Sequence, residues 1–374
     1  MSKIILVMDS YKGCLGSEEV EYSVKEALLE RFPECTVKCL PVADGGEGLL
    51  DTLRKVSGLR CVDVEVHDPL MHVRKSRYGI LPDGETVVIE MAEAGGLSLL
   101  NEAERNPMRT TSFGTGELVL DALSRGYRKF LIGIGGSATN DAGMGMLEAL
   151  GVSFYDKEGH KLVSSGEAMC RIARMDLSCM ESTLSECMFK VACDVKSPFC
   201  GPEGAAYVFA AQKGATSEQV KALDEGMCRF ADVIYEGLGK EVRNVAGAGA
   251  AGGLGGALYA FLNAELVSGA DLILDMVGFD KELADADCVI TGEGKSDMQT
   301  LMGKVPSKVL EKARRLNVPV ILLSGKAENK ESLLHAGFSE VVEVTPEETA
   351  LDEAVKPEVA KENLRLAVCR LLLK

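Results

Sequence analysis

Short apolar runs alternate with glycine-rich loops and amphipathic segments along most of this chain. Ile4 to Met8 is continuously apolar, which is typical of a strand buried on both faces of a parallel sheet. Ser17 is placed to cap the next segment, in which apolar residues recur at helical spacing from Val20 onward. A second strand is expected over Thr36 to Val42, followed by another helix. Two β–loop–α units of this kind predict a doubly wound α/β sheet.

The pattern changes after residue 60. Valines alternate from Val62 to Val66, and the runs 78–81 and 86–90, joined by Pro82-Asp-Gly84, predict a β-hairpin. This is antiparallel patterning, whereas the βαβ pattern returns from about Leu283. We therefore expect one α/β domain from residues 1–68 and 284–374, with residues 69–283 inserted as a second α/β domain.

The segment Leu131 to Gly145 predicts a strand, a tight glycine turn and a helix. Backbone N–H groups at such a helix start, with the side chains of Ser137, Thr139 and Asn140, suit a phosphate oxygen. The carboxylate of Asp141 would repel a phosphate directly, but it could bind a Mg²⁺ ion that in turn binds the phosphate. The alternative is a turn whose serine and threonine only cap the helix.

Further along, each predicted strand ends in polar residues. Phe189 to Cys193 ends in Asp194, and the apolar start of the segment 208–214 also suggests a strand end. A helix begins near Ser217, with its apolar face inward. Cys288 to Thr291 predicts another strand, with the charged segment 292–297 as the loop after it.

Composition excludes several classes of protein. At 374 residues the chain is longer than one hydrophobic core usually accommodates, which predicts two domains. Its formal net charge of −16 argues against nucleic-acid binding. The twelve cysteines have irregular spacing, without a C-x-x-C pair, so we interpret them as reduced cytoplasmic thiols. The N-terminal run is unlike a secretory signal, and no apolar run reaches membrane-spanning length. We expect a cytoplasmic protein with small-molecule substrates and no membrane partner, as a monomer or homodimer.

Two stretches weakly match a dinucleotide-binding pattern: Gly247-x-Gly249-x-x-Gly252, with Asp271 downstream, and Gly133-x-Gly135-x-x-Ala138. They keep open a nicotinamide-dependent hydroxy-acid oxidoreductase, and a non-catalytic regulator that binds sugar acids also stays open. The sequence Gly294-Lys-Ser296 is not a P-loop, because the required earlier glycine is Val289.

Carboxylates and lysines in glycine-rich loops indicate a different chemistry. In open α/β sheets the carboxyl ends of the strands bind ligands. Lysines and backbone amides would hold phosphates, acidic residues would hold Mg²⁺, and one aspartate would accept a hydroxyl proton. The residues concerned include Asp9, Lys12, Asp44, Asp141, Asp194, Lys213, Glu293, Lys295, Asp297 and Lys304.

These motifs resemble the bacterial type I glycerate kinases. The resemblance is carried by the segments 9–13, 42–48, 110–118, 135–141, 212–215, 247–255 and 289–294, with Gln299-Thr300 and Gly303-Lys304. It implies ATP-dependent phosphorylation of D-glycerate with Mg²⁺, with 2-phosphoglycerate as the product. The implied fold is a discontinuous flavodoxin-like domain with an inserted restriction-enzyme-like domain and an active-site cleft between the two.

The roles we assign on this basis fall into four groups. Lys12, Lys295, Asp194 and Asp297 are the expected catalytic residues, with Asp194 the first candidate for the base and Asp297 the second. Residues expected to bind the nucleotide are Gly135, Gly136, Ser137, Thr139, Asn140, Gly249, Gly252, Gly253, Gly292, Glu293 and Gly294. Residues expected to bind the substrate are Asp9, Ser10, Asp44, Gly45, Gly46, Glu47, Thr111, Ser112, Gly114, Thr115 and Lys213. Asp141, Asp194 and Glu293 are the expected metal ligands.

The chain departs from the family pattern at five positions. Tyr11 stands where the family usually has Phe, Lys295 where it has Arg, and Ser296 where it has Ile. Ser197 replaces an Asn and Ala142 a Gly. Lys295 keeps the positive charge of an arginine but not its bidentate geometry toward phosphate.

Overall fold

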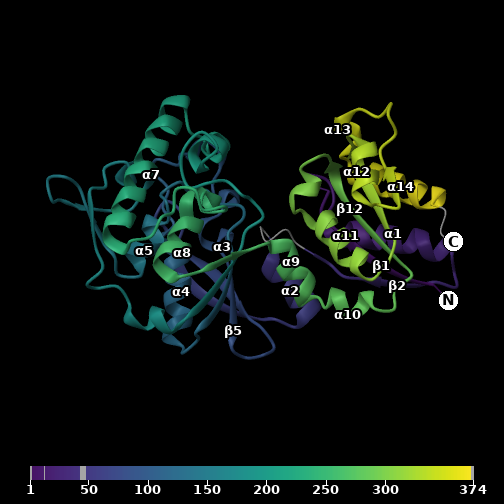
Figure 1. The fold of residues 1–374 in the computed structure, drawn as a ribbon, viewed down its shortest axis with the longest axis horizontal. Helices are drawn as coiled ribbons and strands as arrows, with labels where there is room; N and C mark the ends of the chain where they lie inside the picture. Colours follow the sequence, from purple (N-terminus) through teal and green to yellow (C-terminus); the bar gives the residue numbers. More distant parts are fainter. Residues whose placement is uncertain (1, 12, 43–47, 372–374) are drawn as a thin grey trace. The chain divides into compact units, whose positions relative to one another are not determined.

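A computed structural model describes residues 2–11, 13–42 and 48–371 (Figure 1). The chain forms two compact units. Unit 1 comprises residues 1–44 and 270–374, and unit 2 comprises residues 45–269. Both ends of the chain therefore contribute to one unit.

Unit 1 is built on a five-stranded sheet in which every pairing is parallel. Its strands are β1 (Lys3–Met8), β2 (Thr36–Cys39), β12 (Cys288–Ser296), β13 (Val320–Ala327) and β14 (Glu340–Glu343), in the order β14-β13-β12-β1-β2. Numbered within the unit this is 2-1-3-4-5, the order of flavodoxin-type sheets. The order in which successive strands are added reverses between β1 and β12, because β2 lies on one side of β1 and β12, β13 and β14 lie on the other.

Helices cover both faces of this sheet. On one face α1 (Ser17–Arg31) and α14 (Pro357–Arg370) lie side by side, although they come from opposite ends of the chain (Figure 1). Val24 and Leu364 pack there against Leu6 and Leu323 of the sheet. α11 (Val305–Arg315) packs against β1, β12 and β13. The remaining elements of the unit are α9 (Gly269–Met276), α10 (Phe279–Leu283), η7 (Thr300–Met302), α12 (Lys330–Ala336) and α13 (Leu351–Ala354).

Unit 2 contains a six-stranded mixed sheet. Its strands are β3 (Arg60–His67), β4 (Val73–Ile80), β5 (Thr86–Glu90), β6 (Lys129–Gly133), β10 (Met188–Ala192) and β11 (Glu265–Val267), in the order β11-β10-β6-β5-β4-β3. β5, β6, β10 and β11 are parallel, so their carboxyl ends lie at one edge. A small antiparallel sheet adds β7 (Ser153–Tyr155), β8 (Lys161–Leu162) and β9 (Arg174–Asp176).

The helices of unit 2 enclose an apolar core. They are α2 (Leu49–Ser57), α3 (Ala92–Gly95), α4 (Phe113–Ser124), α5 (Met144–Ala149), α6 (Gly166–Met169), α7 (Ser217–Leu238) and α8 (Leu254–Leu262). The short turns are η1 (Leu97–Leu99), η2 (Glu102–Glu104), η3 (Ser182–Glu186), the π-helical η4 (Ala206–Ala210), η5 (Ala211–Lys213) and η6 (Ala250–Gly253). Within the described residues no helix combines the length and apolar character needed to cross a bilayer.

The boundaries between the two units along the chain lie at different residues from those expected. The sequence placed the boundaries at residues 68 and 283, but the chain divides at residues 44 and 269. β3 pairs with β4 along its whole length, from Arg60 opposite Ile80 to His67 opposite Val73, so it belongs to unit 2. α9 and α10 belong to unit 1, where Lys312 of α11 forms ion pairs with Asp275 and Asp280.

Two local predictions were wrong. Residues 206–213 form a π-turn followed by a 3₁₀ turn, not the end of a strand. Gly292 to Ser296 is not a loop but the second half of β12, which continues alongside β13 as far as Ser296 opposite Ala327. The prediction of α7 is confirmed, since Leu223, Met227 and Phe230 are fully buried.

Candidate active site

In unit 1 the polar residues gather where β1 and β12 lie side by side. Met8 pairs with Gly292, and the backbone N–H of Asp9 donates to the Gly292 carbonyl at 2.9 Å. Asp9 follows β1 and Glu293 lies on the neighbouring strand, with exposed fractions of only 6% and 5%. The backbone N–H of Ser10 donates to Asp9 Oδ1 at 2.6 Å. Two carboxylates therefore lie at the point where the strand order reverses, which is where open α/β sheets bind ligands.

Glu293 is held by three donors. Its Oε1 accepts hydrogen bonds from Thr300 Oγ1 at 2.5 Å and from Ser296 Oγ at 3.1 Å. Its Oε2 forms an ion pair with Lys304 Nζ at 3.1 Å. Gly292 permits this packing, because a Cβ there would lie 2.2 Å from the Leu323 carbonyl oxygen. Glu293 thus fixes the segment 296–304, and its hydroxyl partners Ser296 and Thr300 could not be predicted from sequence spacing.

The other predicted residues of unit 1 are more exposed. Lys295 projects from β12 and forms an ion pair with Glu328 at 3.0 Å, with 56% of its side chain exposed. Asp297 Oδ1 accepts a hydrogen bond from the backbone N–H of Gln299 at 2.7 Å, so this carboxylate caps a turn. The predicted residues Lys12, Asp44, Gly45, Gly46 and Glu47 lie outside the described residues.

In unit 2 the loops that follow the parallel strands hydrogen-bond to one another. The N–H of Leu97 donates to the Gly136 carbonyl at 2.8 Å, which joins the loops after β5 and β6. The N–H of Ala142 donates to the Gly252 carbonyl at 3.0 Å, which joins the loop after β6 to the glycine-rich turn before α8. The N–H of Gly249 donates to the Ser197 carbonyl at 3.0 Å, which adds the loop after β10. These contacts unite three segments that the sequence singled out separately.

The glycines of the turn before α8 are required by close approach. A Cβ on Gly252 would lie 2.1 Å from the Thr139 carbonyl oxygen, and one on Gly249 would lie 2.2 Å from the Pro198 carbonyl oxygen. Gly253 has φ of 95° and caps α8. These glycines pack backbone against backbone, so they serve the loop cluster and not a Rossmann-type strand-to-helix turn.

Asp141 is fully buried and its carboxylate is saturated. Oδ2 accepts hydrogen bonds from the N–H and Oγ of Ser112, at 2.7 and 2.8 Å, and from the N–H of Gly145 at 3.1 Å. Oδ1 accepts from the N–H of Gly143 at 3.1 Å, and Thr111 Oγ1 lies 3.5 Å from Oδ2. A buried carboxylate with these donors organises the starts of α4 and α5. These contacts favour a structural role for Asp141 over the metal-ligand role that we expected.

The substrate residues expected at the start of α4 are buried with Asp141. Thr111, Ser112 and Thr115 have exposed fractions of 2%, 0% and 0%. A Cβ on Gly114 would lie 2.0 Å from the His67 carbonyl oxygen. In this structure Thr111, Ser112, Gly114 and Thr115 are buried at the start of α4 and pack as structural residues beside the loop after β6.

Thr139 and Asn140 are also fully buried, yet Thr139 Oγ1 and Asn140 Oδ1 have no hydrogen-bond partner among the described residues. Asn140 Nδ2 lies 3.2 Å from Met227 Sδ. By contrast Gly136 is exposed, and it has φ of 74°, which suits glycine. The accessible part of this loop is therefore the turn at Gly135 and Gly136, with Ser137 just beneath.

Asp194 is a half-exposed carboxylate at the end of β10. Its Oδ1 accepts hydrogen bonds from Ser268 Oγ at 3.1 Å and from the N–H of Gly269 at 2.9 Å. Ser268 follows β11, so two neighbouring strand ends meet at Asp194. The sequence signalled Ser268 only as a polar residue after a short apolar run.

Lys213 ends η5 and reaches the same loop cluster. Only 3% of the residue is exposed, and Nζ donates to Ser137 Oγ at 2.5 Å and to the Thr139 carbonyl at 2.7 Å. Burial lowers the pKa of Lys213 to about 7, while the negative field of Asp141 acts in the opposite direction.

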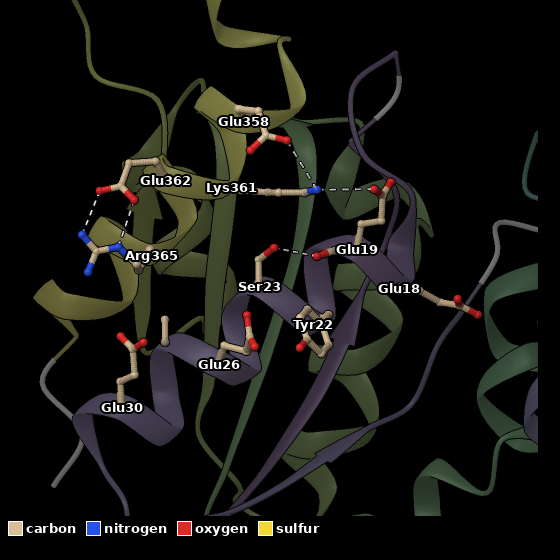
Figure 2. Close-up of a pocket in the computed structure, with 11 residues that line it drawn as sticks. Glu18, Glu19, Tyr22, Ser23, Glu26, Glu30, Glu358, Lys361, Glu362 and Arg365 are labelled. Atoms are coloured by element: carbon tan, nitrogen blue, oxygen red, sulfur yellow. Dashed lines mark hydrogen bonds and ion pairs between the residues drawn. The ribbon is translucent and has the colours of Figure 1, made fainter.

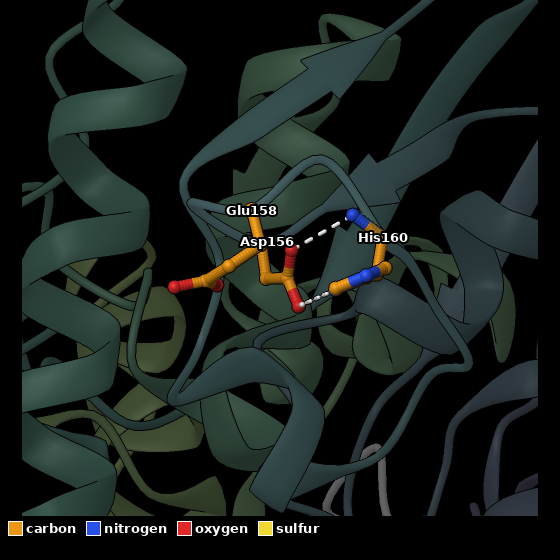
Figure 3. Close-up of side chains that lie close together, drawn as sticks. All are labelled: Asp156, Glu158 and His160. Atoms are coloured by element: carbon orange, nitrogen blue, oxygen red, sulfur yellow. Dashed lines mark hydrogen bonds and ion pairs between the residues drawn. The ribbon is translucent and has the colours of Figure 1, made fainter.

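Two polar clusters lie elsewhere. Asp156, Glu158 and His160 gather in the turn between β7 and β8 (Figure 3), where Asp156 Oδ1 accepts a hydrogen bond from the His160 N–H at 2.8 Å. A groove of about 680 Å³ runs along the outer surfaces of α1 and α14 (Figure 2). Its lining includes the carboxylates of Glu18, Glu19, Glu26, Glu30, Glu358 and Glu362. These six carboxylates outnumber the basic residues Lys361 and Arg365 of the same lining, so the groove is not a candidate for the nucleotide site.

Comparison with known proteins decides between the classes left open by the sequence. The profile of the Glycerate kinase family matches residues 4–373. The chain belongs to the glycerate kinase family. The resemblance predicted from the motifs is thereby confirmed, as is the α/β fold class. Membership makes the chain a kinase, with ATP as one of its small-molecule substrates.

Individual relatives agree along almost their whole length. The glycerate kinase of Bacillus subtilis (strain 168) is 41% identical, over 94% of this chain and 92% of the relative. The glycerate 2-kinase of Escherichia coli (strain K12) is 39% identical, over 95% of this chain and 93% of the relative. A crystal structure described as a glycerate kinase 2 from Salmonella typhimurium LT2 superposes with a TM-score of 0.82 at 42% identity, covering 98% of this chain and 96% of that one.

Proposed function

We propose that this chain transfers the γ-phosphate of ATP to the 2-hydroxyl of D-glycerate and releases 2-phosphoglycerate and ADP. The family match over residues 4–373 is the observation that supports glycerate as the substrate. The choice of hydroxyl rests on the name of one relative, the glycerate 2-kinase of Escherichia coli.

The reaction needs positioning and charge stabilisation more than covalent chemistry from the protein, because the transferred phosphoryl group passes through a loose transition state. The strand-end loops of both units supply suitable groups. In unit 1 the segment around Ser10 lies at the switch point beside Glu293. In unit 2 the accessible turn at Gly135 and Gly136 offers backbone N–H groups next to Ser137, although α5 begins only at Met144.

Asp194 is the residue that we propose accepts the hydroxyl proton. It is half-exposed, and its Oδ1 is oriented by Ser268 and Gly269. Asp297 is the second candidate, although its Oδ1 already caps a turn at Gln299. A half-exposed carboxylate whose position is set by hydrogen bonds is suited to proton transfer with a bound hydroxyl.

The donor set also fits Mg²⁺, which prefers oxygen ligands and is usually held by one or two carboxylates together with substrate phosphates. Of the expected ligands, Asp141 is fully buried and Glu293 is paired with Lys304, so metal binding by Asp194 is the alternative to its role as proton acceptor. When bound, the ion would neutralise charge that develops on the β- and γ-phosphates.

An assay of ADP release tests this function directly. Purified enzyme with ATP and Mg²⁺ should release ADP on addition of D-glycerate, and much less on addition of lactate, tartronate or simple sugars. Lactate lacks the 3-hydroxyl and tartronate replaces the CH₂OH group with a second carboxylate. Equal release with all of these acceptors, or none with D-glycerate, contradicts the proposal.

The substitution Asp194→Asn tests the proton acceptor. It keeps the shape and the hydrogen bonds to Oδ1 but removes the basic oxygen, so kcat should fall at least ~100-fold. The matched control is Asp297→Asn, for which we expect a smaller loss. The rates are measured across a wide Mg²⁺ range: recovery of Asp194→Asn by excess Mg²⁺ would assign the residue to metal binding, and wild-type turnover would remove it from both roles.

A further inference from the structure

The amine of Lys213 is buried against neutral partners. Its Nζ donates to the hydroxyl oxygen of Ser137 and to the Thr139 carbonyl, at 2.5 and 2.7 Å. Buried lysines ordinarily pair with a carboxylate. Asp141 is the charged group whose field reaches Lys213, but its carboxylate is engaged by Ser112, Gly143 and Gly145. The site therefore holds an amine with no counterion in contact with it among the described residues.

The backbone beside this amine is closely packed. Lys213 follows a π-helical turn, a rare element that is frequently found at functional sites. The next residue, Gly214, has φ of 94°, and a Cβ there would lie 2.2 Å from the carbonyl oxygen of Arg105. The backbone of Arg105 thus packs closely against Gly214, the residue next to Lys213, while Lys213 Nζ contacts Ser137 and Thr139 of the loop after β6.

Ser137 connects the amine to the accessible turn. Its oxygen accepts the hydrogen bond from Lys213, which leaves its own hydroxyl hydrogen to donate elsewhere. No acceptor for that hydrogen occurs in the described part of the chain. Ser137 has an exposed fraction of 7% and directly follows the exposed Gly136. Among the described residues, the Ser137 hydroxyl is therefore a free donor directly next to a turn whose backbone N–H groups suit an anion.

We propose that Ser137 donates this hydrogen bond to an anionic oxygen of a substrate bound at the Gly135–Gly136 turn, and that Lys213 acts through Ser137 as a positioning residue that takes up one proton from solvent when the anion binds. This deepens the proposed function and rests on it. The anion is either a phosphate of the nucleotide or the carboxylate of glycerate, and both have the required chemistry.

The proton uptake follows from electrostatics. In the free protein, burial favours the neutral amine of Lys213, as stated above. When an anionic oxygen of the substrate accepts the hydrogen bond from Ser137, a second negative charge, in addition to that of Asp141, lies near the amine. This charge favours the ammonium form of Lys213. The ammonium in turn polarises the Ser137 hydroxyl and strengthens its bond to the anion.

Calorimetric titration at pH 8 in HEPES and in Tris measures the uptake, because the two buffers differ in ionisation enthalpy. D-glycerate and a non-hydrolysable ATP analogue with Mg²⁺ are titrated separately into the full-length enzyme. We expect uptake of about one proton with one of the two ligands, since the free amine is mostly neutral at that pH. Uptake with D-glycerate identifies a carboxylate as the anion, and uptake with the analogue identifies a phosphate.

Variants assign the proton. Lys213→Met and Lys213→Arg should both bind without proton uptake, one never charged and the other always charged. Ser137→Ala should lose the uptake and weaken binding of the same ligand about tenfold, the loss expected for one hydrogen bond to a charged group. The matched control is Lys240→Met, since Lys240 is a half-buried lysine of unit 2 whose pKa is also lowered by burial. It should retain the full uptake.

A purely structural role for Lys213 predicts a different result. Lys213→Met would then lose stability, while the proton uptake of the wild type would be absent or would survive in the variant. Absence of proton uptake in the wild type, or its survival in Lys213→Met, overturns the proposal. If Lys213→Met does not fold, Ser137→Ala provides the test. ADP release with D-glycerate from the same preparation separates the two levels: activity without proton uptake overturns this relay alone, whereas absence of activity overturns the proposed function.

Discussion

Ala142 has φ of 54°, a left-handed conformation that costs a residue with a Cβ about 1–2 kcal/mol. The strain is local to the loop after β6, where Ala142 donates its N–H to the Gly252 carbonyl. Ala142→Gly should remove this strain while losing one buried methyl group. The free energy of unfolding, measured with urea, should stay level or rise.

Ala138→Gly is the matched control for this substitution. Ala138 lies in the same loop and is equally buried, but its φ is not positive. It should lose about 1 kcal/mol, through the methyl group and the added freedom of the unfolded chain. An equal loss in the two variants would show that Ala142 stores no strain.

Glu21 makes the stability of unit 1 depend on pH. It is 2% exposed, its Oε1 accepts a hydrogen bond from the N–H of Met8, and burial raises its pKa from 4.5 to about 8. Between these values the folded chain keeps a proton that the unfolded chain releases. Stability should therefore fall as the pH rises from about 4.5 to 8, by at most about 1.4 kcal/mol per pH unit.

Glu21→Gln should remove this slope, since glutamine accepts the same hydrogen bond without a charge. Urea unfolding at pH 5 and at pH 8 should show little change at the lower pH and a clear gain at the higher one. Glu30→Gln, at an exposed position of α1, should change neither value. A wild-type slope in Glu21→Gln would assign the pH dependence to other groups.

At this scale the sequence singled out individual polar residues but could not show which groups they contact. Asp141 was predicted to face a metal or a substrate, yet it is saturated by Ser112, Gly143 and Gly145. Ser112 is remote from it in sequence, and patterning cannot reveal which distant donors a carboxylate meets. Lys213 was found because it follows a recognisable motif, but its burial was not predictable.

Among the elements, β12 is central to unit 1 because it pairs with both β1 and β13. Gly292 allows the close packing, since a Cβ there would lie 2.2 Å from the Leu323 carbonyl oxygen and 2.5 Å from Met8 Cε. Gly292→Ala should cost about 2–3 kcal/mol as an overpacked site, with loss of activity, because Asp9 and Glu293 flank it.

The control for Gly292→Ala is Gly16→Ser. Gly16 precedes α1 with φ of −67°, and a Cβ there would meet only Glu19 Oε2, at 3.8 Å. Serine is a favourable N-cap, so stability should be kept or raised. Thermal unfolding of both variants provides the comparison, and a stable, active Gly292→Ala would show that the strands tolerate separation at this point.

Element prediction succeeded where periodicity extended over several turns and failed where runs were short. The 22 residues of α7 carry a long apolar face and a Thr216 cap, and both were visible in the sequence. The apolar run near Val208 is too short to distinguish a strand from a helical turn. Gly292 to Ser296 combines glycines with charges, which is typical of a loop, but pairing with β13 makes it a strand.

For the whole molecule, the prediction that both ends of the chain build one α/β unit could be made because the βαβ pattern recurs after the insertion. The boundaries were less predictable. Val62 to Val66 alternates as an edge strand would, and only its pairing with β4 shows which sheet it joins. The glycerate kinase family was identified from loop motifs, and some of their glycines, such as Gly249 and Gly252, lie where a Cβ would meet neighbouring backbone.

The central claim, that this chain phosphorylates the 2-hydroxyl of D-glycerate, is tested most directly by phosphorus NMR of the product. The enzyme is incubated with ATP, Mg²⁺ and D-glycerate, and the new phosphate ester signal is recorded without proton decoupling. We predict a doublet, from coupling to the single proton on C2. A triplet, from coupling to the two protons on C3, would contradict the assignment of the hydroxyl, and the absence of a new ester signal would contradict the transfer itself.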